Sequence, residues 1–118
     1  MYFPRISHYC HVALEQYYEE HVGLPYHILI DSRRLGFPIV HAETDFRRTF
    51  SFGDTARVEI STVKVGRSSL TLRYRLSKLG EDEECVVSEL TTVCVDMDTF
   101  RPVPIPDDLR AVFEATRE

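Results

Sequence analysis

Apolar residues recur every three or four positions near the start of the chain, and this period predicts one long amphipathic helix. The apolar face consists of Ile6, Tyr9, Cys10, Ala13, Leu14 and Tyr17. Pro4 suits the first helical turn, where its missing N–H costs nothing. Gly23 suits the left-handed position that ends a helix, and Pro25 follows soon after. We therefore expect a helix from Pro4 to Val22.

From residue 36 the hydrophobic period changes to two, which predicts strands with one buried face. We expect four strands, at about 40–47, 56–63, 70–76 and 85–97. Short turns at 52–54 and Gly66, and a loop at 77–84, favour an antiparallel meander. The expected buried positions are Val40, Ala42, Thr44 and Phe46, then Ala56, Val58, Ile60 and Thr62, then Leu70, Leu72, Tyr74 and Leu76, and finally Cys85, Val87, Val93 and Val95. Leu90 interrupts the last alternation, so a bulge or a stretch buried on both faces is expected there.

The end of the chain combines an extended segment with a short helix. Three prolines within 101–106 prevent a helix and predict an extended path along the surface. Asp107 or Asp108 would then cap a helix with Leu109, Val112 and Phe113 on one side. A short helical turn is expected around 26–31. The order of helix, strands and helix predicts an α+β fold in one domain, residues 1–118.

The composition of the chain argues against several classes of function. The net charge of −5 argues against a general nucleic-acid binder, and no apolar run reaches the ~20 residues of a membrane-spanning helix. The cysteines Cys10, Cys85 and Cys94 are odd in number and match no metal motif. We expect reduced cysteines in a cytoplasmic protein without a metal or another cofactor.

Three groups of residues have chemistry to offer. His8, His11 and Glu15 share a helix face, but ordinary polar positions explain them better than a metal site. Cys10 lies on the apolar face, which disfavours a nucleophile. The backbone N–H groups of Tyr2 and Phe3 have no partner within the helix. With the helix dipole they would bind a carbonyl oxygen or an oxyanion, unless solvent alone satisfies them.

A second polar candidate is the turn around Gly66. Lys64 and Arg67 place two cations on either side of it. Such a pair would grip a phosphate. The alternative is a solvated hairpin turn, and the local sequence by itself favours that reading.

An ordered set of short motifs gives the chain a resemblance to a known family. The motifs are Tyr2-Phe3-Pro4-Arg5, Gly23-Leu24-Pro25-Tyr26, Phe37-Pro38-Ile39-Val40, Phe52-Gly53-Asp54, Val65-Gly66-Arg67-Ser68-Ser69 and Arg101-Pro102-Val103-Pro104-Ile105-Pro106. Together they resemble the 4-hydroxybenzoyl-CoA thioesterase family, which consists of hotdog-fold acyl-CoA thioesterases. Each motif is weak alone, whereas their common order over nearly the whole chain is fairly specific.

The resemblance implies a five-stranded antiparallel sheet wrapped around the long helix, in a homodimer or homotetramer with active sites between subunits. It implies hydrolysis of an aromatic or short-chain acyl-CoA. The N–H of Phe3 or Tyr2 would polarise the thioester carbonyl. Lys64 and Arg67 would bind the CoA phosphates, and Thr49 and Phe50 would contact the acyl group.

The sequence departs from the family pattern at its start. Family members carry a first strand and an Asp-x-Asp-x-x-Gly-type loop before the Tyr-Phe-Pro segment, and the second aspartate there is the nucleophile or general base. Neither is present here, so we expect four strands and an exposed sheet edge, or one covered by a partner chain, with reduced solubility. Either the start codon is assigned too late, or the chain has lost hydrolysis. In the second case it would be a non-catalytic acyl-CoA-binding or interaction module.

Overall fold

The structure is a computed structural model that describes residues 3–23, 31–48, 56–81 and 83–117, with side chains from Val12 onward except that of Ala56. Residues 31–33 are helical. The remaining helices and strands are α1 (Phe3–His21), β1 (Leu35–Gly36), β2 (Ile39–Phe46), β3 (Ala56–Val65), β4 (Ser69–Lys78), β5 (Glu84–Val93), β6 (Val95–Asp96) and α3 (Asp107–Ala115). The long helix agrees with its predicted bounds to within one residue at each end.

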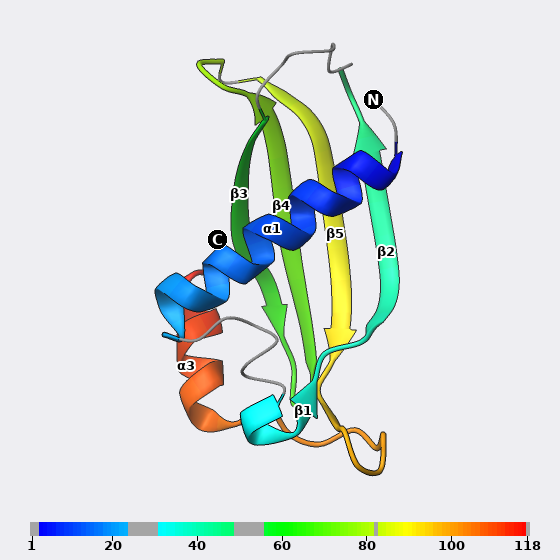
Figure 1. Cartoon of the computed structure of the whole chain (residues 1–118), viewed down its shortest axis with the longest axis vertical. Helices are drawn as coiled ribbons and strands as arrows, with labels where there is room; N and C mark the ends of the chain where they lie inside the picture. Colours follow the sequence, from blue (N-terminus) through cyan, green and yellow to red (C-terminus); the bar gives the residue numbers. More distant parts are fainter. Residues whose placement is uncertain (1–2, 24–30, 49–55, 82, 118) are drawn as a thin grey trace.

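Four long strands form one antiparallel sheet in the order β2-β5-β4-β3, and β1 pairs with β6 in a separate two-stranded ribbon. Helix α1 lies diagonally across one face of the sheet, from β2 at its N-terminal end to β3 at its C-terminal end (Figure 1). The short helix α3 lies beside the C-terminal end of α1. The α+β class and the four main strands predicted from the hydrophobic periods are confirmed.

The core lies between the sheet and the two helices. Strand β4 contributes Leu70, Leu72, Tyr74 and Leu76, each at most 4% exposed, and Leu109 and Phe113 of α3 are 0% exposed. The Tyr18 ring of α1 meets the Phe113 ring edge-on, with centroids 6.2 Å apart. The predicted apolar faces of β4 and α3 are therefore confirmed, and aromatic rings join α1 to α3.

The predicted half-burial of β2 is wrong. Val40 is 60% exposed and Phe46 is 54% exposed, and Ala42 is also exposed. Strand β2 is an edge strand that pairs only with β5 among the described residues, and the strand whose backbone α1 approaches most extensively is β3. The alternation along β2 therefore predicts a strand correctly, but it does not predict whether another element buries the apolar face of that strand.

The predicted face of the last strand is right only in part, because Cys85 and Val95 are buried whereas Val87 and Val93 are only half-buried. Val86, Ser88 and Leu90 lie opposite Leu76, Tyr74 and Leu72 and so share the helix-facing side. The sequence misleads here because a polar residue, Ser88, occupies an inner position, where its hydroxyl lies 3.0 Å from that of Thr44. No register shift occurs at Leu90. The strand is shorter than predicted, because it ends at Val93 and the chain then turns into β6.

The segment before α3 follows its prediction in part. Residues 101–106 are not helical, but Ile105 is only 2% exposed, so the segment contributes to the core. The N-cap of α3 is Pro106, without a side-chain cap, and Asp107 and Asp108 lie inside the first turn. The predicted aspartate cap is wrong because the Asp108 carboxylate accepts hydrogen bonds from Arg33 instead.

Candidate functional site

The first candidate is the N-terminus of α1. The helix begins at Phe3, and its first turn contains no acidic residue. The backbone N–H groups at this end therefore have no acidic side chain of their own turn as a competing acceptor, and the helix dipole favours a negative ligand there. Among the residues predicted to act here, Tyr2 lies outside the described residues and Phe3 is described by its backbone alone. The predicted acyl-contacting residues Thr49 and Phe50 also lie outside the described residues.

The second candidate is the turn between β3 and β4. Lys64 is the penultimate residue of β3 and Arg67 lies in the turn, so the structure places both cations at one end of the sheet. Both side chains are exposed. Neither one has a hydrogen-bond or ion-pair partner among the residues that the structure describes. Both cations are therefore available to an anion from solution.

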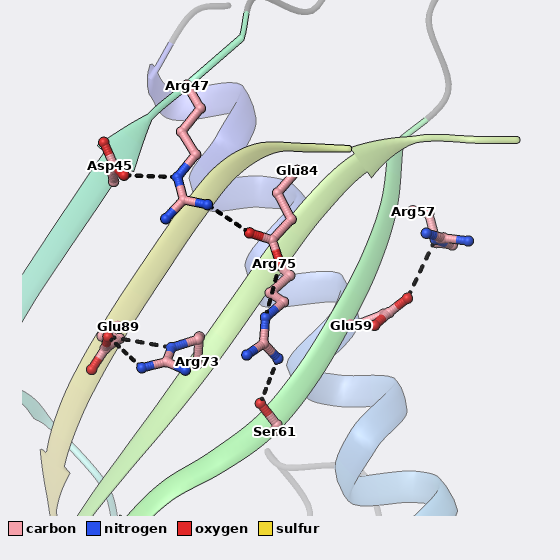
Figure 2. Close-up of polar contacts among 9 residues, drawn as sticks. All are labelled: Asp45, Arg47, Arg57, Glu59, Ser61, Arg73, Arg75, Glu84 and Glu89. Carbon is pink, nitrogen blue, oxygen red and sulfur yellow. Dashed lines mark hydrogen bonds and ion pairs between the residues drawn. The ribbon is translucent and has the colours of Figure 1, made fainter. Parts of the chain in front are cut away.

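The outer face of the sheet carries further charges, but they neutralise one another (Figure 2). Arg73 on β4 pairs with Glu89 on β5 at 3.0 Å. Arg75 pairs with Glu84 at 3.1 Å and donates to the Ser61 hydroxyl at 3.1 Å. Glu84 also accepts a 2.9 Å bond from Arg47. A cavity of about 270 Å³ on this face is lined by Glu43, Thr44, Asp45, Arg47, Val87 and Glu89. The face is thus a solvated ionic network rather than a free cation cluster.

The structure also contains a groove that the sequence did not single out. It has a volume of about 420 Å³ and lies between the C-terminal half of α1 and the edge strand β3. Its lining comprises Ala13, Gln16, Tyr17, Glu20, His21, Val58, Glu59 and Ile60. The Tyr17 hydroxyl is 2.6 Å from the Thr116 hydroxyl, and burial raises the pKa of Tyr17. None of the predicted site residues lines this groove. The spacing of residues in the sequence does not predict the groove, because α1 and β3 meet only in the folded chain.

The described residues show no metal-binding cluster of three or more histidine, cysteine, aspartate or glutamate side chains. The side chains of His8 and His11 lie outside the described set. Cys85 and Cys94 are buried free thiols, and burial raises the pKa of Cys94. None of the described helices combines the length and the hydropathy needed to cross a membrane.

The two candidate sites lie at different ends of one chain. Figure 1 shows the N-terminal end of α1 over the upper half of β2, whereas the β3–β4 turn lies at the lower end of the sheet. The molecule measures 42 Å along its long axis, which is vertical in this view. The structure therefore does not bring Phe3 together with Lys64 and Arg67 within a single chain.

Comparisons with known proteins place this geometry in a family. A 1,4-dihydroxy-2-naphthoyl-CoA hydrolase from Synechococcus elongatus is 26% identical over 100% of this chain and 85% of its own length. A protein of the same name from Nostoc punctiforme is 27% identical over 99% of this chain and 77% of its own length. The crystal structure of a thioesterase superfamily protein from Jannaschia sp. CCS1 superposes with a TM-score of 0.88 at 24% identity, covering 99% of this chain and 81% of that chain.

These similarities confirm the predicted hotdog arrangement, an antiparallel sheet with one long helix across it. The narrower placement among the 4-hydroxybenzoyl-CoA thioesterases stays a prediction. The sequence model described as "Thioesterase-like superfamily" matches residues 1–113, which include α1, the whole sheet and most of α3. The chain therefore belongs to the thioesterase-like superfamily.

Proposed function

We propose that this protein is an acyl-CoA thioesterase that hydrolyses the thioester of an aromatic or short-chain acyl-CoA. The observation that carries the proposal is the superfamily match over residues 1–113. The naphthoyl-CoA hydrolases to which the chain is similar act on an aromatic acyl group, which supports the aromatic class. The ordered motifs from Tyr2-Phe3-Pro4-Arg5 to Arg101-Pro102-Val103-Pro104-Ile105-Pro106 favour the 4-hydroxybenzoyl-CoA thioesterase family within the superfamily.

The N-terminus of α1 is the proposed site of carbonyl polarisation. Attack on a thioester develops negative charge on the carbonyl oxygen, and backbone N–H groups aimed at that oxygen stabilise the charge. A helix that begins at Phe3 offers such donors in its first turn, and the helix dipole adds to their effect. The family resemblance assigns the role to the N–H of Phe3 or Tyr2. The role depends on backbone groups, so neither aromatic side chain is required for it.

Lys64 and Arg67 are the proposed phosphate-binding residues. Both are exposed and lack partners among the described residues, whereas Arg33, Arg34, Arg47, Arg48, Arg57, Arg73, Arg75 and Arg117 each pair with a carboxylate. A guanidinium binds phosphate through two parallel hydrogen bonds, and an ammonium adds a point charge. We also propose, on the family resemblance, that Thr49 and Phe50 contact the acyl group.

The site is proposed to combine two subunits. Exposed Ile39, Val40 and Phe46 on an edge strand favour pairing of β2 with β2 of a second copy. A two-fold axis through such an antiparallel pair turns the sheet of the second subunit end over end relative to the sheet of the first. The turn of the partner, with Lys64 and Arg67, would then lie at the same end as α1's N-terminus in the first subunit. A homodimer, or a homotetramer built from it, would thereby bring the two candidate sites to the same end of one joined sheet.

The alternative is a binding module on the same fold that holds an acyl-CoA without hydrolysing it. One observation favours it: the first turn of α1 carries no acidic residue that would act as a nucleophile or base beside the proposed carbonyl site. Fold alone does not separate the two functions.

A thiol-release assay separates the hydrolase from the binding module. The purified protein is mixed with 4-hydroxybenzoyl-CoA, 1,4-dihydroxy-2-naphthoyl-CoA and acetyl-CoA, and free coenzyme A is detected with a thiol reagent. Calorimetry measures coenzyme A binding in parallel. Saturable thiol release supports the hydrolase, and saturable binding without release supports the binding module. If neither is found, both proposals are wrong.

A further inference from the structure

The β3–β4 turn is held from behind by an arginine of α3. The Arg110 Nη2 atom donates to the carbonyl oxygen of Gly66 at 2.8 Å and to that of Arg67 at 3.1 Å. The backbone N–H of Ile105 donates to the same Arg67 carbonyl at 2.8 Å. Two successive carbonyls of the turn are therefore hydrogen-bonded by α3 and by the segment that leads into it.

The other bonds of the turn leave it little freedom. The Gly66 N–H donates to the Ser69 carbonyl at 2.8 Å, and the Cys94 N–H donates to the Ser68 carbonyl at 2.7 Å. A Cβ atom at Gly66 would lie 2.4 Å from the Ser69 hydroxyl oxygen, so the Ser69 side chain would have to rotate to admit a larger residue. The backbone path that presents Arg67 to solvent is thus fixed by one bond within the turn and by bonds from Cys94, Ile105 and Arg110 outside it.

Arg110 also changes the electrostatics of the turn. Carbonyl oxygens carry partial negative charge, and a guanidinium bound to two of them offsets that charge. Nearby acids on α3 are already engaged, since Asp108 pairs with Arg33 and Glu114 pairs with Arg117. Asp107 is exposed at the start of the helix. The Arg110 guanidinium therefore stays on the two turn carbonyls, because no carboxylate among the described residues binds it.

We propose that Arg110 is a positioning residue for phosphate recognition: it fixes the β3–β4 turn so that Arg67 and Lys64 meet the phosphate groups of an acyl-CoA. This inference rests on the proposed function, because it takes Lys64 and Arg67 as the groups that touch phosphate. Arg110 itself acts through the turn backbone. A substitution at Arg110 should therefore matter only while the two cations are present.

The test is a double-mutant cycle read out as coenzyme A affinity by calorimetry. The variants are Arg110→Met, which keeps the aliphatic stem and removes the donors, the pair Lys64→Gln with Arg67→Gln, and all three changes combined. Arg110→Lys retains the charge and can reach one carbonyl. Arg117→Gln is the matched control, because it removes one charge just after α3 from a residue whose side chain bonds Glu114.

Arg110→Met should weaken coenzyme A binding about tenfold, the size expected for one lost charge-assisted hydrogen bond. Arg110→Lys should restore part of the loss, and Arg117→Gln should bind like the wild type. In the Lys64→Gln/Arg67→Gln background, Arg110→Met should add less than about a twofold loss, because contacting groups are not additive. Thermal unfolding of each variant checks that the protein is folded, and Arg110→Lys decides the outcome if Arg110→Met is not.

Two results would overturn the inference in different ways. If Lys64→Gln/Arg67→Gln lowers the affinity but Arg110→Met leaves it unchanged, or adds its full loss in that background, Arg110 does not act through the turn and the phosphate-binding proposal survives. If Lys64→Gln/Arg67→Gln binds coenzyme A like the wild type, the turn is not the phosphate site, and both proposals fail together.

Discussion

A single hydroxyl of Tyr17 joins three elements. It lies 2.6 Å from the Thr116 hydroxyl, which in turn lies 3.0 Å from the hydroxyl of Thr62 on β3. Thr62 is 0% exposed, so these polar atoms depend on one another for hydrogen bonds. Helix α1, the edge strand β3 and the end of α3 are held together by this chain of hydroxyls.

Replacing Tyr17 with Phe should lower the free energy of unfolding by about 1 kcal/mol, because one hydrogen bond is lost while the two threonines keep theirs. Urea unfolding at pH 7 measures this change. Tyr18→Phe serves as a comparison in the same helix turn. An unchanged stability in Tyr17→Phe would show that the hydroxyl chain contributes nothing.

The same tyrosine should make stability depend on alkaline pH. Burial raises the Tyr17 pKa in the folded state, whereas the unfolded value is about 10. The folded state therefore holds its proton more tightly, so the contribution is fully present below pH 10 and is lost as the pH rises through the folded pKa. Between pH 8 and pH 11, the free energy of unfolding should fall less steeply in Tyr17→Phe than in the wild type.

The helices and strands show how much of the fold the hydrophobic pattern can predict. The bounds of α1, the inner faces of β3 and β4 and the apolar side of α3 follow from local periodicity, because each packs into one core. The face of β2 and the middle of β5 do not follow, because an edge strand lacks cover and a buried Ser88 is satisfied by Thr44 from another strand. The candidate site is also only partly predictable from the sequence. Lys64 and Arg67 stand out as two cations around a turn, whereas the hydrogen bond from Arg110 to that turn spans more than forty residues of sequence.

Helix α3 should be a strong contributor to stability despite its nine residues. Leu109 is 0% exposed, so Leu109→Ala should cost about 2–5 kcal/mol through lost burial and a cavity. Val112→Ala, at a half-buried position of the same helix, should cost less. Chemical denaturation measures both. An equal and small effect of the two substitutions would mean that α3 is not part of the core.

The ionic network on the outer face of the sheet should contribute little. The Arg73 and Glu89 side chains are 26% and 35% exposed, and pairs that water reaches contribute about 0–1 kcal/mol. A double-mutant cycle with Arg73→Gln and Glu89→Gln should therefore give a coupling energy below about 1 kcal/mol. A coupling above about 3 kcal/mol would instead indicate a buried pair, as in a face covered by another subunit.

In the whole molecule, the proposed site depends on the assembly of two subunits. Val40→Lys places a charge on the exposed edge of β2 and should shift the protein toward monomer in analytical ultracentrifugation. Leu79→Lys is a matched control, because Leu79 is 66% exposed in the turn after β4. If Val40→Lys assembles like the wild type, β2 is not the subunit interface, and the two candidate sites are not united along this edge.

The decisive measurement for the proposed thioesterase is steady-state thiol release from 4-hydroxybenzoyl-CoA and 1,4-dihydroxy-2-naphthoyl-CoA. It is compared between the wild type and Lys64→Gln/Arg67→Gln. We expect saturable release by the wild type. We also expect a raised KM with little change in kcat for the variant, because phosphate contacts act on the ground state and the transition state alike. The absence of thiol release by the wild type from either substrate, at any protein concentration tested, would contradict the assignment as an aromatic acyl-CoA thioesterase.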